Sequence, residues 1–342
     1  MHHSHRHHKK SEKILKRLIP IIVLLISLSI LFFLSGKIRE SQRTKIPEDY
    51  KESYKPVEKE RKKIEKDGKV YTEKSDIETY LVMGIDVDGK VEDNQNISIS
   101  DLGQADVQAV IVVDNKNESW QILELNRDTM ADVKQISSFG QSLGYKKMQL
   151  ALAHSYGTNL KEGCENTVDA VSRLLYDQAF DGYISMNMDS VKIITDMVGG
   201  VDLEITSDFS KIDTSLLEGQ TQTITGEQAL TFIRARMGID DGTNQSRMNR
   251  QNQFLSALMS KISEEDDKFI AEAYNEISDY IVSDMGSGPV INLGEKLHKY
   301  EYKGLLTIEG ESSVNDETGY VEYVLDENDL KEKIIQIFYA MQ

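Results

Sequence analysis

An uncharged run near the N-terminus constrains this chain more than any other feature. Residues 18–36 carry no charged side chain, and a helix of roughly 20 apolar residues crosses the hydrocarbon core of a bilayer. A cleaved signal peptide would have a shorter apolar region and small residues before the cleavage site, whereas this run ends in Phe-Leu-Ser-Gly-Lys. The run therefore predicts one transmembrane helix, retained as a single-pass membrane anchor.

The flanks of this run predict its orientation. Residues 1–17 are rich in lysine and arginine and contain one acidic residue, Glu12, and such a flank stays in the cytoplasm. We therefore expect a cytoplasmic tail at 1–17 and an extracellular location for everything after the membrane helix. Residues 37–75 mix lysine with glutamate and have few large aliphatic side chains. They predict an extracellular stalk, either partly helical or disordered, and the folded domain is expected at 76–342.

Charge and residue usage exclude several kinds of function. The net charge of −17 would repel nucleic acid, so we expect no DNA or RNA partner. Cys164 is the only cysteine, which excludes an intrachain disulfide. Outside the histidine-rich N-terminus only His154 and His298 remain, so a zinc site or a Ser-His-Asp triad has little support.

Strands and helices alternate along the expected domain. A buried strand at 79–84 leads to Asp86, and a hairpin follows with strands at 106–113 and 120–125. The alternation then continues, which predicts an α/β fold with a layered sheet, preceded by the transmembrane helix. The further elements expected are helices at 146–156, 165–176, 190–198, 247–263, 268–281 and 329–341, and strands at 180–186, 201–205, 302–308 and 319–324.

Arginine is concentrated at two places. Five of the six arginines in the expected domain lie in the stretch 225–253 or in the turn at Arg127. Guanidinium groups form planar forks that suit phosphate oxygens, and a helix N-terminus favours anions. We predict an anion site there, although ion pairs with carboxylates are an alternative. The stretch contributes Arg234 and Arg236 at the end of one helix, and Arg247 and Arg250 at the start of the next.

Carboxylates accompany the arginines. Antiparallel pairing of the hairpin strands brings Asp106, at the start of one strand, beside Arg127 and Asp128, which follow the other. Asp86 ends the strand before them. Taken singly, Asp106 and Asp128 are also consistent with ordinary loop or cap residues.

The order of the motifs resembles one known family. A membrane anchor is followed by LVMGID, ADV, NRDT, KKMQLALAHSYG, GYISMNMDSVKIITDMVGGVDLEI, GEQALTFIRAR and SRMNRQNQFL. This series resembles the LytR-CpsA-Psr family of bacterial cell-wall enzymes, closely over residues 77–262 and more loosely beyond. The resemblance implies a three-layer α/β/α fold with a central mixed β-sheet and a hydrophobic groove for a polyprenyl lipid. It also implies a Mg²⁺-dependent phosphotransferase that attaches a polyprenyl-pyrophosphate-linked glycopolymer, such as wall teichoic acid or capsular polysaccharide, to peptidoglycan.

The resemblance also implies roles for individual residues. Mg²⁺ is expected on Asp106 and Asp86, and our hypothesis is that Asp128 orients or deprotonates the acceptor hydroxyl. Pyrophosphate is expected on Arg127, Arg234, Arg236, Arg247, Gln251 and Lys147, with Arg250 added from the clustering above.

The chain departs from the family pattern beside these residues. Ala105 and Val107 replace hydroxyl-bearing residues beside Asp106, and Asn244 replaces an aspartate, which puts metal affinity in question. A non-catalytic, membrane-tethered scaffold that binds a lipid-linked glycopolymer is therefore an alternative. A DNA-binding regulator is disfavoured, because the expected cytoplasmic segment is too short for a DNA-binding domain.

Helical spacing marks apolar residues that would line either a lipid groove or an ordinary core, and the spacing alone does not distinguish the two. They are Ile193, Ile194, Met197, Leu230, Ile233, Leu255, Leu258 and Met259.

Overall fold

A computed structural model describes residues 61–91, 102–137, 140–242, 244–262, 264–265 and 267–341. The predicted cytoplasmic tail, the predicted transmembrane helix and residues 37–60 of the predicted stalk lie outside the described residues. Within those ranges, none of the helices has both the length and the apolar character needed to cross a membrane.

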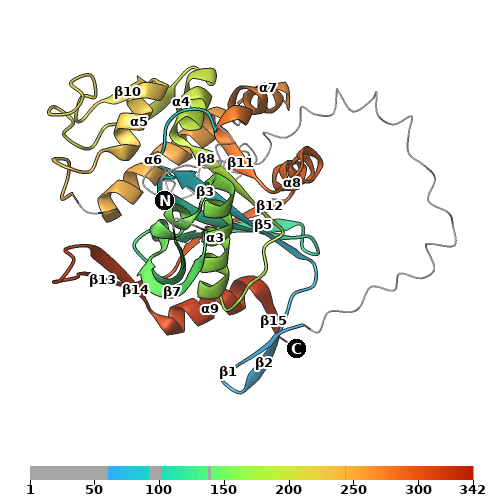
Figure 1. The fold of residues 1–342 in the computed structure, drawn as a ribbon. Coiled ribbons are helices and arrows are strands. Elements are labelled where there is room, and N and C mark those ends of the chain that lie inside the picture. Colours follow the sequence, from blue (N-terminus) through green and yellow to red (C-terminus); the bar gives the residue numbers. More distant parts are fainter. Residues whose placement is uncertain are drawn as a thin grey trace, which may run out of the picture.

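A six-stranded mixed sheet forms the centre of the fold (Figure 1). Its strands lie in the order β11-β8-β3-β4-β5-β12. β3 is parallel to β8 and antiparallel to β4, and β5 is antiparallel to β4 and parallel to β12. The expectation of a central mixed sheet is thus confirmed. The strands are β3 (Ile77–Ile85), β4 (Ala105–Asp114), β5 (Ser119–Leu125), β8 (Gly182–Asn187), β11 (Ile281–Ser283) and β12 (Glu301–Thr307).

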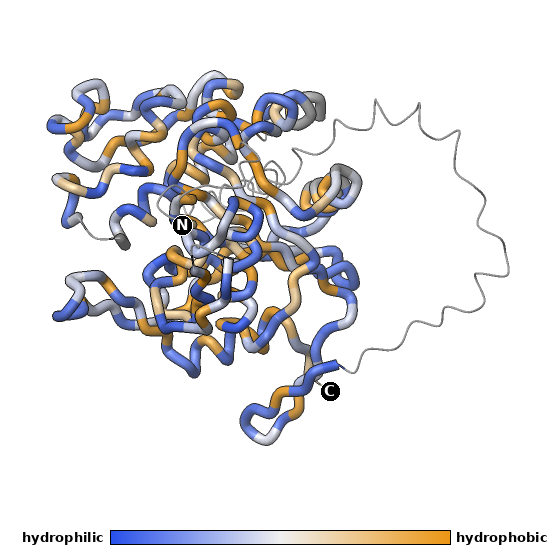
Figure 2. The backbone as a smooth tube through the Cα atoms, viewed as in Figure 1, coloured by the Kyte–Doolittle hydropathy of each residue, from blue (hydrophilic) through white to orange (hydrophobic). Residues whose placement is uncertain are grey.

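Helices pack on both faces of this sheet because its strands are apolar on both faces. In β3, Val82 faces one hydrophobic cluster, and Leu81 and Met83 face the other. Figure 2 shows the hydrophobic segments gathered along the inner strands and the inward helix faces. The first cluster includes α4 (Met188–Met197), α5 (Gly226–Arg234), α6 (Asn244–Ile262), α7 (Asp267–Ile277) and α8 (Ser287–Lys299); the second includes η6 (Leu150–Tyr156), α3 (Leu160–Leu174) and α9 (Glu327–Phe338).

The N-terminal side of the domain differs from the prediction of a stalk up to residue 75. β1 (Lys63–Lys66) and β2 (Lys69–Glu73) form a hairpin, and β2 also pairs with β15 (Tyr339–Met341) near the C-terminus. Residues 61–75 therefore belong to the folded domain. Composition did not predict this hairpin, because its strands are rich in lysine and glutamate, are largely exposed and bury few apolar side chains.

A second correction concerns the predicted helix at 146–156. Its first part lies in β7 (Ser142–Gln149), which pairs with β6 (Met130–Ile136), and only its second part is helical, as η6. The strand pairing with β6 overrides the helical spacing there.

The remaining elements lie outside the central sheet. They include α8, which the sequence did not predict because Gly288, Pro289 and Gly294 weaken the helical pattern. The expected helix at 268–281 ends at Ile277, and that at 329–341 ends at Phe338. The others are β9 (Val201–Glu204), β10 (Thr221–Ile224), η7 (Ser278–Tyr280), β13 (Gly310–Val314) and β14 (Val321–Leu325).

Burial of a histidine in this fold makes its stability depend on pH. His154, a residue of η6, is fully buried against α3. Its Nδ1 lies 3.3 Å from the Gly103 carbonyl, and its Nε2 lies 3.7 Å from Cys164 Sγ. Burial lowers the pKa of His154 from 6.5 to about 4. The unfolded chain therefore binds a proton at a higher pH than the native chain does.

We predict that the free energy of unfolding falls by about 3 kcal/mol as the pH falls from near 6.5 to near 4 because of His154 alone. Urea unfolding across this range checks it, with His154→Gln as the comparison. The variant is expected to be less stable at neutral pH but to have a flatter pH dependence. Equal slopes for the two proteins would contradict the assignment.

Candidate active site

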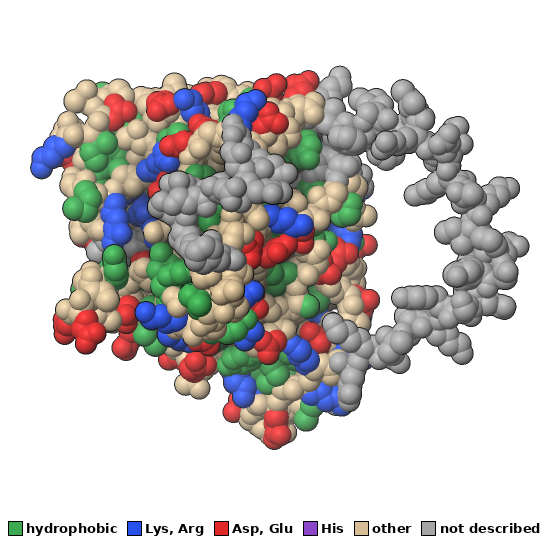
Figure 3. Space-filling view, in the orientation of Figure 1, with side chains coloured by type: hydrophobic (Ala, Val, Ile, Leu, Met, Phe, Trp, Pro, Cys, Tyr) green, Lys and Arg blue, Asp and Glu red, His purple; other side chains and the backbone are tan. Residues whose placement is uncertain are grey.

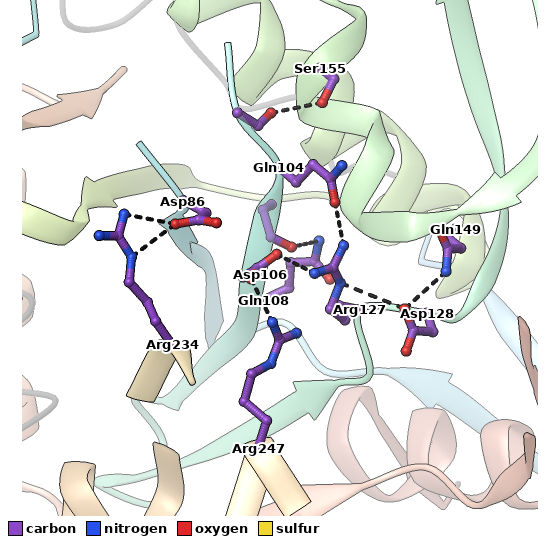
Figure 4. A network of polar contacts seen from close by, with 12 residues as sticks. Asp86, Gln104, Asp106, Gln108, Arg127, Asp128, Gln149, Ser155, Arg234 and Arg247 are labelled. Atoms are coloured by element: carbon purple, nitrogen blue, oxygen red, sulfur yellow. Dashed lines mark hydrogen bonds and ion pairs between the residues drawn. The ribbon is translucent and has the colours of Figure 1, made fainter. Parts of the chain in front are cut away.

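The site lies at one edge of the central sheet, where several element ends meet (Figure 4). β4 runs antiparallel to β3 and β5, so the start of β4 lies beside the ends of the other two strands. Asp86 follows β3, Asp106 opens β4 and Arg127 follows β5. The end of α5 and the first turns of α6 add arginines from the helical layer. Segments far apart in sequence thus supply one set of charges.

Asp106 is the centre of this set. Its Oδ1 lies 2.6 Å from Arg127 Nη1 and its Oδ2 lies 3.0 Å from Arg247 Nη1. The side chains of all three residues are at most 12% exposed. Burial raises the pKa of Asp106, and the positive charges of Arg127 and Arg247 oppose that rise. One carboxylate therefore holds two buried guanidinium groups together.

Arg236 adds a third positive charge to this group. Its Nε donates a hydrogen bond to the Gly242 carbonyl at 3.2 Å. Burial lowers the pKa of Arg247, and the nearby charges of Arg127 and Arg236 lower it further. Arg127 and Arg247 thus converge on Asp106, and the charge of Arg236 acts on both Asp106 and Arg247. Like charges repel, and a bound anion would relieve that repulsion.

Asp128 lies on the far side of Arg127 from Asp106 (Figure 4). It is 4% exposed, accepts a hydrogen bond from Gln149 Nε2 at 3.0 Å, and lies 3.6 Å from Arg127 Nε. Burial raises its pKa. This position conflicts with the hypothesis that Asp128 deprotonates an acceptor hydroxyl, because Arg127 separates it from the cavity. The contacts instead suit a residue that orients Arg127.

Arg234 is paired with carboxylates at the end of β3. Its Nη2 lies 2.8 Å from Asp86 Oδ1 and 2.9 Å from Asp88 Oδ1. The negative charge of Asp86 contributes to raising the pKa of Asp106, so the two carboxylates are electrostatic neighbours. Arg234 therefore borders the central group through Asp86.

Arg250 does not face the anion site as predicted. Its guanidinium is buried, pairs with Asp240, and donates hydrogen bonds to the carbonyls of Phe232, at 3.2 Å, and Ala235. Arg250 thus ties α6 to the end of α5. Arg250 is three positions from Arg247 and so lies on a similar side of α6. Its guanidinium nevertheless binds the backbone carbonyls of the preceding segment and not the anion site.

Two other predicted phosphate ligands also lie apart from Asp106. Lys147, on β7, is exposed, and its Nζ is 3.9 Å from Asp132 Oδ1. Gln251 donates from Nε2 to the Ile233 carbonyl at 3.4 Å and lines an apolar cavity. A phosphate role for either residue remains a prediction. The side chain of Asn244 lies outside the described residues.

Two cavities meet at this edge of the sheet. The first, here called the anion cavity, has a volume of about 510 Å³. Figure 3 shows blue Lys and Arg side chains gathered in a hollow on the left of the molecule. The residues that line the anion cavity are Asp86, Gly103, Gln104, Asp106, Arg127, Leu152, Ser155, Tyr156 and Arg247.

The second cavity, here called the apolar slot, has a volume of about 160 Å³. It lies between one face of the sheet and helices α4, α5 and α6. Val107 in its wall directly follows Asp106 in β4, so the slot adjoins the anion cavity. Of the apolar residues singled out from the sequence, Ile194, Ile233, Leu255 and Leu258 line it.

The other candidates pack differently. Ile193, Met197 and Leu230 belong to the packed cluster on this face of the sheet, and the side chain of Met259 lies outside the described residues.

Sequence reasoning missed five residues of the anion cavity: Gly103, Gln104, Leu152, Ser155 and Tyr156. No spacing or charge pattern distinguishes them, and only the position of Gln104, two residues before Asp106, offered a signal.

A family model matches residues 42–336 of this chain. The chain belongs to the LytR_cpsA_psr family. A TagU of Halalkalibacterium halodurans, named a polyisoprenyl-teichoic acid–peptidoglycan teichoic acid transferase, is 30% identical over 46% of this chain and 47% of its own length. A TagU of Bacillus licheniformis with the same name is 29% identical over 58% of this chain and 57% of its own length. The chain thus spans about half the length of these curated relatives.

The fold also matches solved structures. TagT, in a structure described as bound to LIIa-WTA, covers 77% of this chain and 90% of its own with a TM-score of 0.56 and 20% identity. At this identity the likeness shows a shared fold.

The internal contacts of Arg250 generate a stability prediction. Arg250→Ala would leave two carbonyls and Asp240 without their buried partner, so we expect a loss of roughly 2–4 kcal/mol in the free energy of unfolding. Urea unfolding measures this. The control is Arg173→Ala, whose exposed pair with Asp169 predicts a loss of less than about 1 kcal/mol. A loss for Arg250→Ala no larger than the control's would exclude a stabilising role.

Proposed function

We propose that this protein is a phosphotransferase that moves a glycopolymer from a polyprenyl pyrophosphate carrier to peptidoglycan. The observation that carries the proposal is the pair of buried arginines, Arg127 and Arg247, that meet on Asp106 and line a cavity beside an apolar slot. A polyprenyl pyrophosphate has this same division between an anionic head and an apolar chain. The names of the TagU relatives support the substrate class, with wall teichoic acid or another wall polysaccharide as the polymer.

The proposed roles follow from the contacts. Arg127, Arg236 and Arg247 bind the pyrophosphate, and the slot takes the first part of the lipid chain. Enzymes that transfer phosphoryl groups act mainly by positioning the reactants and stabilising charge, which buried guanidinium groups supply. A peptidoglycan hydroxyl attacks the phosphorus attached to the glycopolymer, and a new P–O bond forms. The P–O bond from this phosphorus to the bridging oxygen breaks, polyprenyl phosphate leaves with that oxygen, and the hydroxyl proton passes to the released phosphate.

A magnesium ion fits the acidic residues of the site. Mg²⁺ takes one or two protein carboxylates and completes its shell with water and substrate phosphates. Asp106 and Asp86 line the same cavity and provide two carboxylates, in line with this requirement. The two oxygens of Asp106 contact Arg127 and Arg247, so the ion would share this carboxylate with the two arginines. We propose that they hold Mg²⁺, which when bound neutralises charge on the pyrophosphate. Arg234, which is paired with Asp86, would then shift its contacts toward Asp88 or the phosphate.

The proposed cellular arrangement follows from the sequence. We propose that residues 18–36 anchor the chain in the membrane, with the N-terminus cytoplasmic and the catalytic domain outside the cell. The lipid carrier and peptidoglycan, as the proposed partners, meet at that surface. A membrane anchor at residues 18–36 would keep the apolar slot close to the lipid substrate.

A non-catalytic binding scaffold is the second candidate. It is favoured by Ala105 and Val107, which place no hydroxyl beside Asp106. A scaffold would bind the lipid pyrophosphate through the same arginines without consuming it. Release of polyprenyl phosphate in the presence of peptidoglycan therefore separates the two candidates.

Removal of an arginine tests the clamp. With the full chain in detergent, we expect Arg127→Ala or Arg247→Ala to lower transfer from a polyprenyl-pyrophosphate-linked saccharide to peptidoglycan roughly 100-fold. Arg173→Ala, on the exposed surface, is the control and should retain activity. Urea unfolding of each variant separates loss of function from loss of fold. Unchanged transfer by both folded variants would refute the proposal.

Removal of the metal tests the carboxylates. We expect a chelator to abolish transfer and added Mg²⁺ to restore it, because two carboxylates complete a magnesium site only with phosphate and water. Asp106→Asn should raise the Mg²⁺ concentration needed for half-maximal transfer. Full activity in excess chelator would show that transfer needs no metal ion and would contradict the proposed magnesium site.

A further inference from the structure

The turn formed by Gly103 and Gln104 holds two parts of the site at once. The Gln104 carbonyl accepts a hydrogen bond from the Asp86 N–H at 3.0 Å. Its side-chain oxygen accepts a hydrogen bond from Arg127 Nη2. Gln104 therefore links the end of β3, which bears a proposed metal ligand, to the guanidinium group that follows β5.

The turn is itself fixed from below by η6. The Gly103 carbonyl accepts a hydrogen bond from Ser155 Oγ at 2.8 Å and lies 3.3 Å from His154 Nδ1. Gly103 has a φ of +71°, and a Cβ there would lie 2.4 Å from Val87 Cγ1. Only glycine fits this close approach without displacing Val87. The turn thus has little freedom to move, which makes it a firm support for a side chain.

Arg127 is a side chain that needs such support. Asp106 takes Nη1, Asp128 lies near Nε, and Gln104 takes Nη2. The first two partners are carboxylates, which neutralise the charge that a phosphate would use. The amide of Gln104 fixes the third nitrogen without adding negative charge. A neutral acceptor can therefore orient the fork and leave its electrostatic attraction for an anion intact.

We propose that Gln104 is a positioning residue, held by the Gly103 carbonyl and Ser155, that orients Arg127 toward the pyrophosphate. The inference rests on the proposed function, since it names how one residue of that clamp is aimed. Gln104 also lines the anion cavity, but its role here acts through Arg127. Preorganisation of this kind strengthens binding, because the guanidinium loses less freedom when the ligand arrives.

A double-mutant cycle on ligand binding tests this. The probe is geranylgeranyl pyrophosphate with Mg²⁺, titrated calorimetrically into the full chain in detergent. We expect Gln104→Met, which keeps the size but removes the acceptor, to raise Kd about 10-fold, and Arg127→Ala to raise it further. In the double variant, Kd should equal that of Arg127→Ala alone, because the proposed role of the Gln104 side chain acts through Arg127.

Two further variants complete the design. Gln104→Glu keeps an acceptor for Arg127 but adds a negative charge, so its Kd should be raised yet still depend on Arg127. Gln220→Met, at an exposed loop position, is the matched control and should bind as the unaltered protein does. Urea unfolding of every variant confirms that the folded form is compared.

The outcomes are distinguishable. If Arg127→Ala leaves Kd unchanged, the proposed clamp itself fails, and the inference fails with it. If Arg127→Ala weakens binding but Gln104→Met does not, the clamp stands and the inference is wrong. Independent effects, in which the double variant loses the product of the two single losses, would also overturn it, because Gln104 would then act without Arg127.

Discussion

The Asp106 carboxylate between two guanidinium groups is the interaction on which the site depends. Two buried arginines facing each other repel, and their desolvation is costly unless a carboxylate lies between them. Asp106 meets that need from the sheet, while Arg127 and Arg247 come from different layers. The pairing therefore joins β4, the turn after β5 and the start of α6 at one point. Three arginines, Arg127, Arg236 and Arg247, face the two carboxylates of Asp106 and Asp128, and this excess of positive charge favours an anion.

Helix placement follows from similar contacts further back. A capping box of Thr225 and Gln228 begins α5, and Arg234, the last residue of this helix, pairs with Asp86 after β3. Arg250 then bonds carbonyls at that end and draws the first turns of α6 against it. One arginine of the cluster is thus structural, and it sets the position from which Arg247 approaches Asp106.

The sequence predicted the parts of the site that depend on regular geometry. Antiparallel pairing alone predicted that Asp106 lies beside Arg127, because the register of a hairpin determines which residues of its two strands are neighbours. The prediction from sequence failed where other groups of the fold bind the predicted side chains. Arg250 binds backbone carbonyls that no sequence pattern marks. Asp128 accepts a hydrogen bond from Gln149 and lies on the far side of Arg127 from Asp106. Spacing also could not separate Leu258, in the slot wall, from Leu230, in the packed core, since both lie on inward helix faces.

The adjacency of the two cavities explains how one site can select an amphiphile. Val107 and Asp106 are consecutive in β4. Gly84 of β3 pairs with Val107 and Ile85 pairs with Ala105, so Asp106 is the extra residue of a β-bulge. Val107 lines the apolar slot, and Asp106 contacts Arg127 and Arg247. A free phosphate would gain only the charged contacts, and a neutral lipid only the apolar ones. A molecule that carries an anionic head and an apolar chain gains both sets of contacts, which is the physical basis of the selectivity.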